Sequence, residues 1–500
     1  MKQAALDYHS AGKPGKIEVI PTKPYASQRD LSLAYSPGVA EPCLAIEANP
    51  EDAYKYTSKG NLVAVISNGT AVLGLGDIGA MAGKPVMEGK GLLFKIYADI
   101  DCFDLELDTN NVEEFIRTVK LLEPTFGGVN LEDISAPECF EIEERLKKEL
   151  NIPVMHDDQH GTAIISGAAL LNALEINGKD ISKAKIIVNG AGASAISCTK
   201  IYVSLGAKKE NIFMYDSKGL IHGDRTNLDG KKSEFINSSV PADTSLAQIL
   251  EGADVFIGLS RGNVLNQEMI KPMATDPIIF AMANPTPEIS YEDAKASRPD
   301  CIMATGRSDY PNQVNNVLGF PFIFRGALDA RASEINEAMK IGAVHAIAEL
   351  AKKPVPDLVN MAYNGANLIF GKDYIIPKPV DPRLITTVAP AVARAAMESG
   401  VAQNPIKDWE AYEQELAIRL GNTSTLSKVI ENKAKLDLQQ VVFADVENVT
   451  MLKAARVVVE EKIAQPILLG NRAIIQKMLD EHNIELPDVK IIDPKKCEDE

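Results

Sequence analysis

The sequence predicts an α/β protein, and three observations point to this class. Short apolar runs alternate with amphipathic helical segments over most of the chain, which is the pattern of strands covered by helices. One of these runs leads directly into a glycine-rich turn at residues 190–195. The alternation of strands and helices starts again after residue 428. With 500 residues, the chain has room for about three domains.

Composition argues against several classes of partner. The net charge of −17 does not favour nucleic acid or an anionic membrane. The six cysteines include no Cys-x-x-Cys pair, so a zinc knuckle or redox motif is not expected, and scattered thiols fit a reducing compartment. No apolar run is long enough to span a membrane, and residues 1–16 lack the apolar core of a signal peptide. We therefore expect a cytoplasmic protein.

The glycine-rich turn predicts a doubly wound nucleotide-binding domain of the Rossmann type. An apolar strand precedes it, and Gly190 and Gly192 let backbone N–H groups approach a pyrophosphate. The next strand ends about 20 residues on at Asp216, where a ribose hydroxyl partner belongs. A turn without a ligand is the alternative. The predicted cofactor contacts are Gly190, Ala191, Gly192, Ala193, Ser194, Ala195, Asp216, Ser217, Lys218 and Asn284.

The first 60 residues are predicted to combine short helical pieces with turns. Glycines and prolines at positions 12–24 argue against regular structure at the start. Tyr35 precedes a turn at Pro37-Gly38, and a helix is expected to begin beyond that turn. Taken alone, Tyr35 is typical of a half-buried packing residue.

A β-hairpin is predicted from residues 62–67 and 70–75, and a flexible loop over residues 76–85. Lys90 follows between two glycines in an apolar setting. Burial of an ammonium lowers its pKa and makes a general base available near neutral pH. A lysine whose ammonium reaches solvent past an apolar surface is the alternative.

Two successive predicted strands of this first domain end in pairs of acidic residues. The carboxyl ends of such strands meet at one crevice, so Glu132-Asp133 is expected to converge with one member of Asp157-Asp158. Gathered carboxylates need a cation, and oxygen ligands favour Mg²⁺ or Mn²⁺, whereas acidic helix caps are the alternative. His156 and His160 have zinc-like spacing, but a strand before and a glycine after them argue against zinc.

The nucleotide-binding sheet is expected to continue with strands at residues 253–258, 277–282 and 301–304. Asn284 lies just beyond the second of these strands, and a polar loop over residues 308–319 holds Asn315 and Asn316. Amides that both donate and accept hydrogen bonds suit a hydroxy acid or keto acid. An ordinary turn is the alternative for this loop.

The remaining chain is expected to be helical from residue 320 to about residue 371, with a boundary at residues 421–427. A new α/β pattern then follows, with a helix at 451–462, a strand at 465–470, a helix at 472–482 and a strand at 489–493. This stretch is too short for a doubly wound domain of usual size, so we expect a domain that is cut short.

Several motifs resemble those of the malic enzymes, and their order and spacing match over about residues 15–420. They are Tyr35-Ser-Pro-Gly-Val-Ala, Leu73-Gly-Leu-Gly-Asp-Ile-Gly79, Pro85-Val-Met-Glu-Gly-Lys90, Asn130-Leu-Glu-Asp-Ile and His156-Asp-Asp-Gln-His-Gly-Thr-Ala. The chain is most similar to the bacterial hybrid type, which is NADP-dependent and carries a phosphate-acetyltransferase-like domain behind the malic enzyme part. Residues 454–471 resemble the start of that domain.

The resemblance implies three domains: a malate- and metal-binding catalytic domain over residues 1–160, a nucleotide-binding domain with C-terminal helices over 161–425, and a partial phosphate-acetyltransferase-like domain over 428–500. It implies oxidative decarboxylation of L-malate to pyruvate and CO₂ with NADP or NAD. The implied partners are a second copy in a homodimer, a larger oligomer when the third domain is complete, and acetyl-CoA as an effector.

The roles of single residues also follow from the resemblance. Lys90, helped by Asp157, takes the proton of the C2 hydroxyl, and Tyr35 protonates C3 of the enol. The implied ligands of Mg²⁺ or Mn²⁺ are Glu132, Asp133 and Asp158. The implied contacts of the substrate carboxylates are Asn284, Asn315 and Asn316.

Two departures leave alternatives open. Thr70-Ala71 stand where a longer branch of the family has a malate-binding arginine, and Asp216 favours NAD although Lys218 and the resemblance favour NADP. A metal-free NAD(P)-dependent dehydrogenase of another small acid would have no use for the acidic cluster. The alternative to an enzyme is a regulatory chain that binds acyl-CoA.

Overall fold

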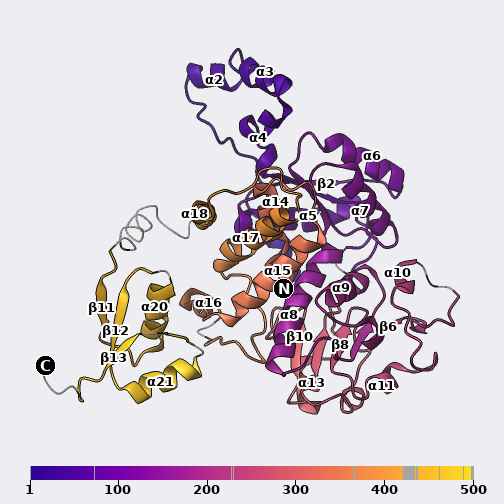
Figure 1. Ribbon diagram of the computed structural model, residues 1–500. Coiled ribbons are helices and arrows are strands. Elements are labelled where there is room, and N and C mark those ends of the chain that lie inside the picture. The colour runs from indigo at the N-terminus through magenta and orange to yellow at the C-terminus, as the bar shows by residue number, and fades with distance from the viewer. Residues whose placement is uncertain are drawn as a thin grey trace.

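The computed structural model describes residues 2–72, 74–226, 228, 230–363, 366–420, 434, 437–460, 462–482, 484–487 and 489–496. Within these residues, three sheets are built almost entirely from parallel strands, and helices cover them (Figure 1). The predicted α/β class is confirmed. None of the described helices is long and apolar enough to cross a membrane.

The first sheet has four parallel strands in the order β2-β1-β3-β4. Every residue of its central strand is buried, and alternate side chains serve two cores. Val65 packs on the side of Met87, whereas Ile66 packs on the side of Phe115. The elements are β1 (Leu62–Ser67), α5 (Ala80–Ala98), β2 (Asp101–Glu106), α6 (Val112–Leu122), β3 (Gly128–Leu131), α7 (Glu138–Glu149) and β4 (Val154–His156).

Two predictions for this domain are wrong. The hairpin does not form, because β1 already has parallel partners on both sides, and Val72 makes only an isolated bridge to Gly76. The loop expected up to Pro85 is helical from Ala80 onward. The buried residues of α5 recur every three or four positions from Ala80 to Ala98, and this apolar stripe outweighs the glycine and proline signals.

The second sheet is the predicted nucleotide-binding unit, with strand order β10-β9-β8-β5-β6-β7. Only the short β7 runs antiparallel. Helix α8 begins at Asp157, directly after β4, and joins the two sheets. The elements are α8 (Asp157–Ile176), β5 (Ile186–Asn189), α9 (Ala193–Ser204), η3 (Lys209–Asn211), β6 (Ile212–Asp216), β7 (Gly219–Leu220), α10 (Gly230–Ser233), α11 (Leu246–Ile249), β8 (Val255–Gly258), α12 (Gln267–Ile270), β9 (Ile278–Ala281), α13 (Tyr291–Ser297), β10 (Ile302–Thr305) and η4 (Asn316–Leu318).

A group of helices then returns to cover both sheets. The stretch that was expected to be helical from residue 320 contains separate helices, namely α14 (Phe320–Asp329), α15 (Glu337–Lys352) and α16 (Asp357–Ala362), and α17 (Arg383–Glu398) and α18 (Trp409–Arg419) follow. Phe94 of α5 stacks edge-on against Phe320 and Phe324 of α14, with ring centres 4.7 and 5.3 Å apart. One continuous core therefore joins the first sheet to the second.

The N-terminal helices stand apart from these cores. Figure 1 shows α2 and α3 projecting beyond the sheets at the top of the molecule, and none of their residues is buried. The predicted mixture of short helical pieces and turns is present over the first 60 residues, and the glycine- and proline-containing stretch over residues 11–27 has no helix or strand; only the helix before Gly12 was not expected. The elements are α1 (Lys2–Ser10), α2 (Gln28–Ala34), α3 (Ala40–Ala48), η1 (Pro50–Asp52), α4 (Ala53–Tyr56) and η2 (Lys59–Asn61).

The C-terminal sheet has its own small core, which includes Leu452, Leu468 and Ile475. The two predicted strands and two predicted helices are present, and a further strand was missed. The elements are β11 (Gln440–Phe443), α20 (Val449–Glu460), β12 (Gln465–Leu469), α21 (Arg472–Glu481) and β13 (Lys490–Ile492). The boundary predicted at 421–427 lies outside the described residues, and the bounds of the three domains remain predictions.

Candidate active site

Lys90 lies in a buried charged group at the carboxyl ends of β3 and β4. Its Nζ is 2.7 Å from Oδ2 of Asp157 and 2.8 Å from Oε1 of Glu132. Its side chain is 10% exposed, and its Nζ is 4.2 Å from the centre of the Phe320 ring, a cation–π distance. Lys90 follows the buried Met87 by one helical turn, which turns it toward the crevice.

The neighbouring charges decide the protonation of Lys90. Burial of the ammonium lowers the pKa of Lys90, but the carboxylates of Asp157 and Glu132 outweigh burial and raise the pKa above its ordinary value. The depressed pKa expected from the sequence is therefore wrong for this arrangement. The reason is that a local apolar setting does not show which charges the fold brings alongside.

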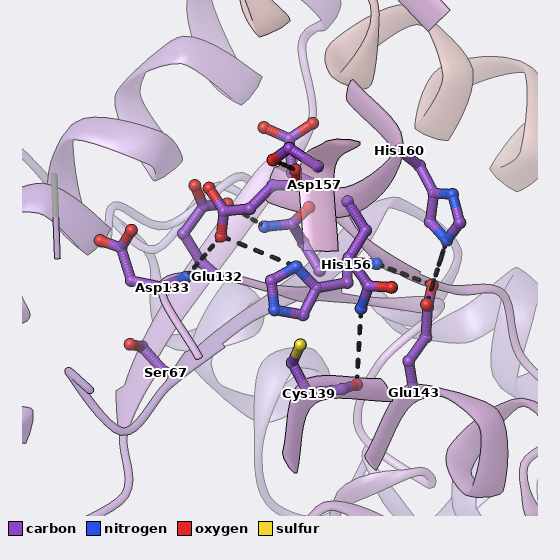
Figure 2. Close-up of polar contacts among 12 residues, drawn as sticks. Ser67, Glu132, Asp133, Cys139, Glu143, His156, Asp157 and His160 are labelled. Atoms are coloured by element: carbon purple, nitrogen blue, oxygen red, sulfur yellow. Dashed lines mark hydrogen bonds and ion pairs between the residues drawn. The ribbon is translucent and has the colours of Figure 1, made fainter. Parts of the chain in front are cut away.

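Three carboxylates lie beside this lysine. Glu132, Asp133 and Asp158 each offer one oxygen, and these oxygens all lie within 4.8 Å of one another. The backbone N–H of Asp133 donates to Oδ2 of Asp158 over 2.8 Å, which ties the end of β3 to the start of α8 (Figure 2). Glu132 and Asp133 are buried, and Asp158 is partly exposed. A set of carboxylate oxygens of this kind fits a hard divalent cation such as Mg²⁺ or Mn²⁺.

The glycine-rich turn follows β5 as predicted, and its backbone explains two of its residues. Gly190 has φ +132°, and a Cβ there would lie 2.3 Å from the carbonyl oxygen of Leu259. A Cβ on Gly192 would meet no protein atom within 4 Å, so that position faces open space at the start of α9. Ala195 is buried, as expected for a residue that holds α9 against the sheet.

A cavity of about 910 Å³ opens at this turn. It is lined by the predicted residues 190–192 and 216–218. Ser194 does not line it, and its Oγ instead donates to the carbonyl oxygen of Asp158 over 2.6 Å. That hydrogen bond connects the nucleotide turn directly to the acidic cluster, so the two predicted sites are neighbours in the fold.

Asp216 ends β6 beside this cavity, but its carboxylate is already engaged. Arg225 donates from Nη1 to Oδ1 and from Nη2 to Oδ2, over 2.9 and 2.8 Å. The backbone N–H of Lys218 donates to Oδ1 as well. Because of the hydrogen bonds from Arg225, the pKa of Asp216 is lowered even though burial alone would raise it. The sequence analysis missed Arg225, since nothing in its local sequence indicates this pairing.

The predicted amides take different positions. Nδ2 of Asn316 donates to Oδ2 of Asp157 over 3.1 Å, so Asn316 belongs to the Lys90 group. Asn315 uses its Oδ1 to cap η4. Asn284 is exposed beyond β9, and its carbonyl oxygen lies close to Gly74, where a Cβ would be 3.2 Å away. The loop after β9 and the loop after β1 therefore approach each other.

Tyr35 does not join this group. Its side chain is 79% exposed, at the turn between α2 and α3, and Figure 1 shows these helices apart from α5. The structure therefore brings together Lys90, Asp157, Asn316 and the three carboxylates, but leaves Tyr35 outside within one copy of the chain.

A second buried network, which the sequence analysis missed, lies behind the acidic cluster (Figure 2). Glu143 accepts hydrogen bonds from the backbone N–H of His156 and from the ring of His160, each over 3.0 Å. Burial lowers the pKa of His160 to about 4. The ring of His160 lies against Glu143 and Lys340, whereas Nδ1 of His156 lies 3.6 Å from Oδ2 of Asp158, so the two rings contact different carboxylates.

Comparison with known proteins places the chain in a family. The model of the malic enzyme N-terminal domain matches residues 14–147, that of the malic enzyme NAD-binding domain matches 159–361, and that of phosphate acetyl/butaryl transferase matches 425–500. Over 497 residues the chain is 54% identical to an NADP-dependent malic enzyme of Haemophilus influenzae, covering 99% of this chain and 66% of the relative.

A second curated relative and a crystal structure are also similar to the chain. An NAD-dependent malic enzyme of Rhizobium meliloti is 53% identical over 498 residues, covering 99% of this chain and 64% of the relative. The crystal structure of malic enzyme from Pyrococcus horikoshii is 42% identical with a TM-score of 0.77, covering 86% of this chain and 98% of that one. The chain thus spans about two thirds of the length of the longer curated relatives. From the matched family models, the sequence identities and the TM-score, the chain belongs to the malic enzyme family.

Proposed function

We propose that the protein oxidises and decarboxylates L-malate to pyruvate and CO₂, with reduction of a nicotinamide dinucleotide and dependence on Mg²⁺ or Mn²⁺. The observation that carries this proposal is the position of Lys90 between Asp157 and Glu132, next to the three-carboxylate cluster. The hydrogen bond from Ser194 to the carbonyl of Asp158 puts the nucleotide turn beside the same cluster. Relatives named as NADP-dependent and NAD-dependent malic enzymes support the assignment.

Lys90 and Asp157 would handle the first proton. The ammonium of Lys90 would first pass one proton to Asp157, whose Oδ2 lies 2.7 Å from its Nζ, and the neutral amine would then receive the proton of the malate C2 hydroxyl. Asn316 fixes Asp157 through a hydrogen bond of 3.1 Å. A cation on Glu132, Asp133 and Asp158 would supply Lewis acidity and positive charge, and the bound dinucleotide would accept the hydride.

Substrate contacts would come from the loops around the crevice. Asn284 and the Nδ2 group of Asn315, whose Oδ1 caps η4, would hold the carboxylates of malate, as the family resemblance implies. Thr70-Ala71 build the loop itself: Thr70 Oγ1 accepts from the N–H of Ser135, and the N–H of Ala71 donates to the carbonyl of Asp133. In place of the arginine found in the longer branch, this segment would therefore support the metal-binding residues.

Tyr35 would act in the crevice of a second copy. The segment that carries it has an exposed apolar surface made of Leu31, Leu33, Tyr35 and Leu44, each at least 57% exposed. Such a surface needs a partner, and a homodimer in which α2 and α3 of one copy cover the Lys90 group of the other would bury it. Tyr35 would then protonate C3 of the enol from across the interface.

The proposal extends to the cellular location of the protein, its oligomeric state and its effector. We propose that the protein works in the cytoplasm. In a chain with the whole third domain, we propose a larger oligomer and acetyl-CoA as an effector, supported by the match of residues 425–500 to phosphate acetyl/butaryl transferases.

The test is the absorbance at 340 nm with malate, Mn²⁺ and either NADP⁺ or NAD⁺, followed by an assay for pyruvate. Reduction that produces pyruvate and stops with EDTA is the expected result. Reduction that persists with EDTA would favour a metal-free dehydrogenase. No reduction by folded protein, with either nucleotide, would contradict the proposal.

A further inference from the structure

The nucleotide cavity carries an excess of positive charge in a strongly acidic chain. Among the described residues that line it, four carry cationic side chains and two carry acidic ones, whereas the whole chain has a net charge of −17. The cations are Lys218, Arg225, Lys232 and Arg261, and the acids are Asp216 and Asp243. The uncharged ribose hydroxyls of NAD do not require this excess of positive charge. The 2′-phosphate of NADP adds a negative charge of nearly two units, which the excess cations would stabilise.

The ion pair at the end of β6 removes the usual obstacle to that phosphate. An acidic residue at this strand end normally accepts hydrogen bonds from the ribose and repels a 2′-phosphate. Here the Asp216 and Arg225 side chains are only 12% and 15% exposed and form a two-point contact. Arg225 therefore compensates the charge of Asp216, and both carboxylate oxygens already accept hydrogen bonds.

The geometry also leaves one edge of the guanidinium available. Nη1 of Arg225 is taken up by Asp216 and by the carbonyl oxygens of Gly219 and Leu220, and Nη2 gives one hydrogen bond to Asp216. Within the described part of the chain, Nε of Arg225 has no hydrogen-bond partner. The edge formed by Nε and the second N–H of Nη2 is the pair of donors that binds a phosphate bidentately.

We propose that Arg225 recognises the 2′-phosphate of NADP and that Asp216 is its positioning residue. Asp216 holds the terminal edge of the guanidinium and leaves the other edge for a ligand in the cavity that Arg225 lines, and Lys218 adds a second positive charge to the same lining. This inference rests on the proposed dinucleotide site and names its preferred ligand. Sequence identity does not make this choice, because relatives named NADP-dependent and NAD-dependent are 54% and 53% identical to the chain.

Binding of two small probes to the intact chain isolates the 2′-phosphate without turnover. Calorimetric titration with 2′,5′-ADP and with 5′-AMP compares ligands that differ only in that group. We expect 2′,5′-ADP to bind at least about tenfold more tightly, as charge-assisted hydrogen bonds predict. In Arg225→Gln, 2′,5′-ADP should lose about 10- to 100-fold in affinity, whereas 5′-AMP should change by less than about threefold.

Three further variants separate contact from charge. Lys232→Gln makes the same change of charge in the same cavity and should weaken 2′,5′-ADP less than Arg225→Gln does. Arg225→Lys, which keeps the charge but loses the planar two-point donor, should be intermediate. In the double variant Asp216→Asn with Arg225→Gln, binding of 2′,5′-ADP should stay weak, because the contact itself is missing.

Several outcomes would overturn the inference. One is equal binding of the two probes to the parent chain, and another is an equal loss of both in Arg225→Gln. Recovery of parent affinity in the double variant would show that Arg225 only shields Asp216. If both probes bind with equal affinity, the role of Arg225 is contradicted but the dinucleotide site is not. If neither probe binds, the dinucleotide site is contradicted as well. Circular dichroism and the thermal midpoint of each variant establish that it is folded.

Discussion

The Lys90 group and the nucleotide cavity handle charge in opposite ways. Around Lys90, buried carboxylates and a buried amine compensate each other within 3 Å, as the 2.7 and 2.8 Å contacts to Asp157 and Glu132 show. Around Arg225, the cavity is open and keeps cations in excess of acids. A group that compensates itself is prepared for moving protons, whereas a cavity with excess charge is prepared for binding an anion. Removing one charge should therefore harm chemistry in the first region and selectivity in the second.

The largest effect is expected from Lys90→Ala. Loss of a positioned proton-transfer group should lower malate turnover by about 10²- to 10⁴-fold. Nucleotide binding should persist, because the cavity lies beyond Ser194. Steady-state reduction at 340 nm and calorimetric nucleotide binding measure the two effects. Lys95→Ala, on the same helix with a side chain 53% exposed, is the matched control and should keep parent turnover. Turnover of Lys90→Ala within about threefold of parent would refute the role of this lysine.

A pair of glycine variants tests how the cavity is built. Gly190→Ala should lower the free energy of unfolding by about 1–3 kcal/mol, because its Cβ would meet the Leu259 carbonyl at 2.3 Å and its φ is +132°. Gly192→Ala should leave stability unchanged, since its Cβ meets no protein atom within 4 Å, but should weaken NADP⁺ binding about tenfold or more by blocking the pyrophosphate.

Thermal unfolding and calorimetric titration of the two glycine variants measure these effects. Equal destabilisation of the two would show that Gly192 is needed for the fold and not for a ligand.

The acidic cluster can be tested by Glu132→Gln, which keeps the shape of the side chain but removes its charge. We expect the affinity for Mn²⁺ to fall by at least about 10- to 100-fold, because one hard anionic ligand is lost. Electron paramagnetic resonance of free Mn²⁺ measures binding without turnover. Glu141→Gln on α7, 56% exposed, should leave the titration unchanged. An unaltered Mn²⁺ titration in Glu132→Gln would exclude the proposed metal site.

An effect on stability alone is expected from His160, which lies behind the cluster. Burial lowers the pKa of His160 to about 4, below the ordinary value of 6.5, so the unfolded chain binds its proton more readily than the folded one. Stability from this group is therefore complete above pH 6.5 and falls between pH 6.5 and 4, by roughly 1–3 kcal/mol.

Urea unfolding at pH 7.5 and pH 5 measures this dependence. The variant His160→Gln should lose part of the difference between the two pH values. If parent and variant show the same pH dependence, another group is responsible.

Much of the site could be anticipated because its residues stand at strand ends. The strands before Glu132, Asp157 and Gly190 are apolar runs that end abruptly, and parallel strands deliver such ends to one edge of a sheet. The prediction of a hairpin after β1 was wrong because strand pairing depends on residues distant in the sequence. A local turn signal at Asn68-Gly69 does not show that both edges of β1 are taken by strands distant in the sequence.

The sequence by itself determined the α/β class, the glycine turn and the chemical types gathered at the crevice, because these depend on local periodicity and on spacing along the chain. Only the tertiary structure decided the state of each charge. The raised pKa of Lys90, the pairing of Asp216 with Arg225 and the separation of Tyr35 from Lys90 all depend on which distant residues become neighbours. Electrostatic interactions act over a few ångströms in space, and the order of residues along the chain does not state those distances.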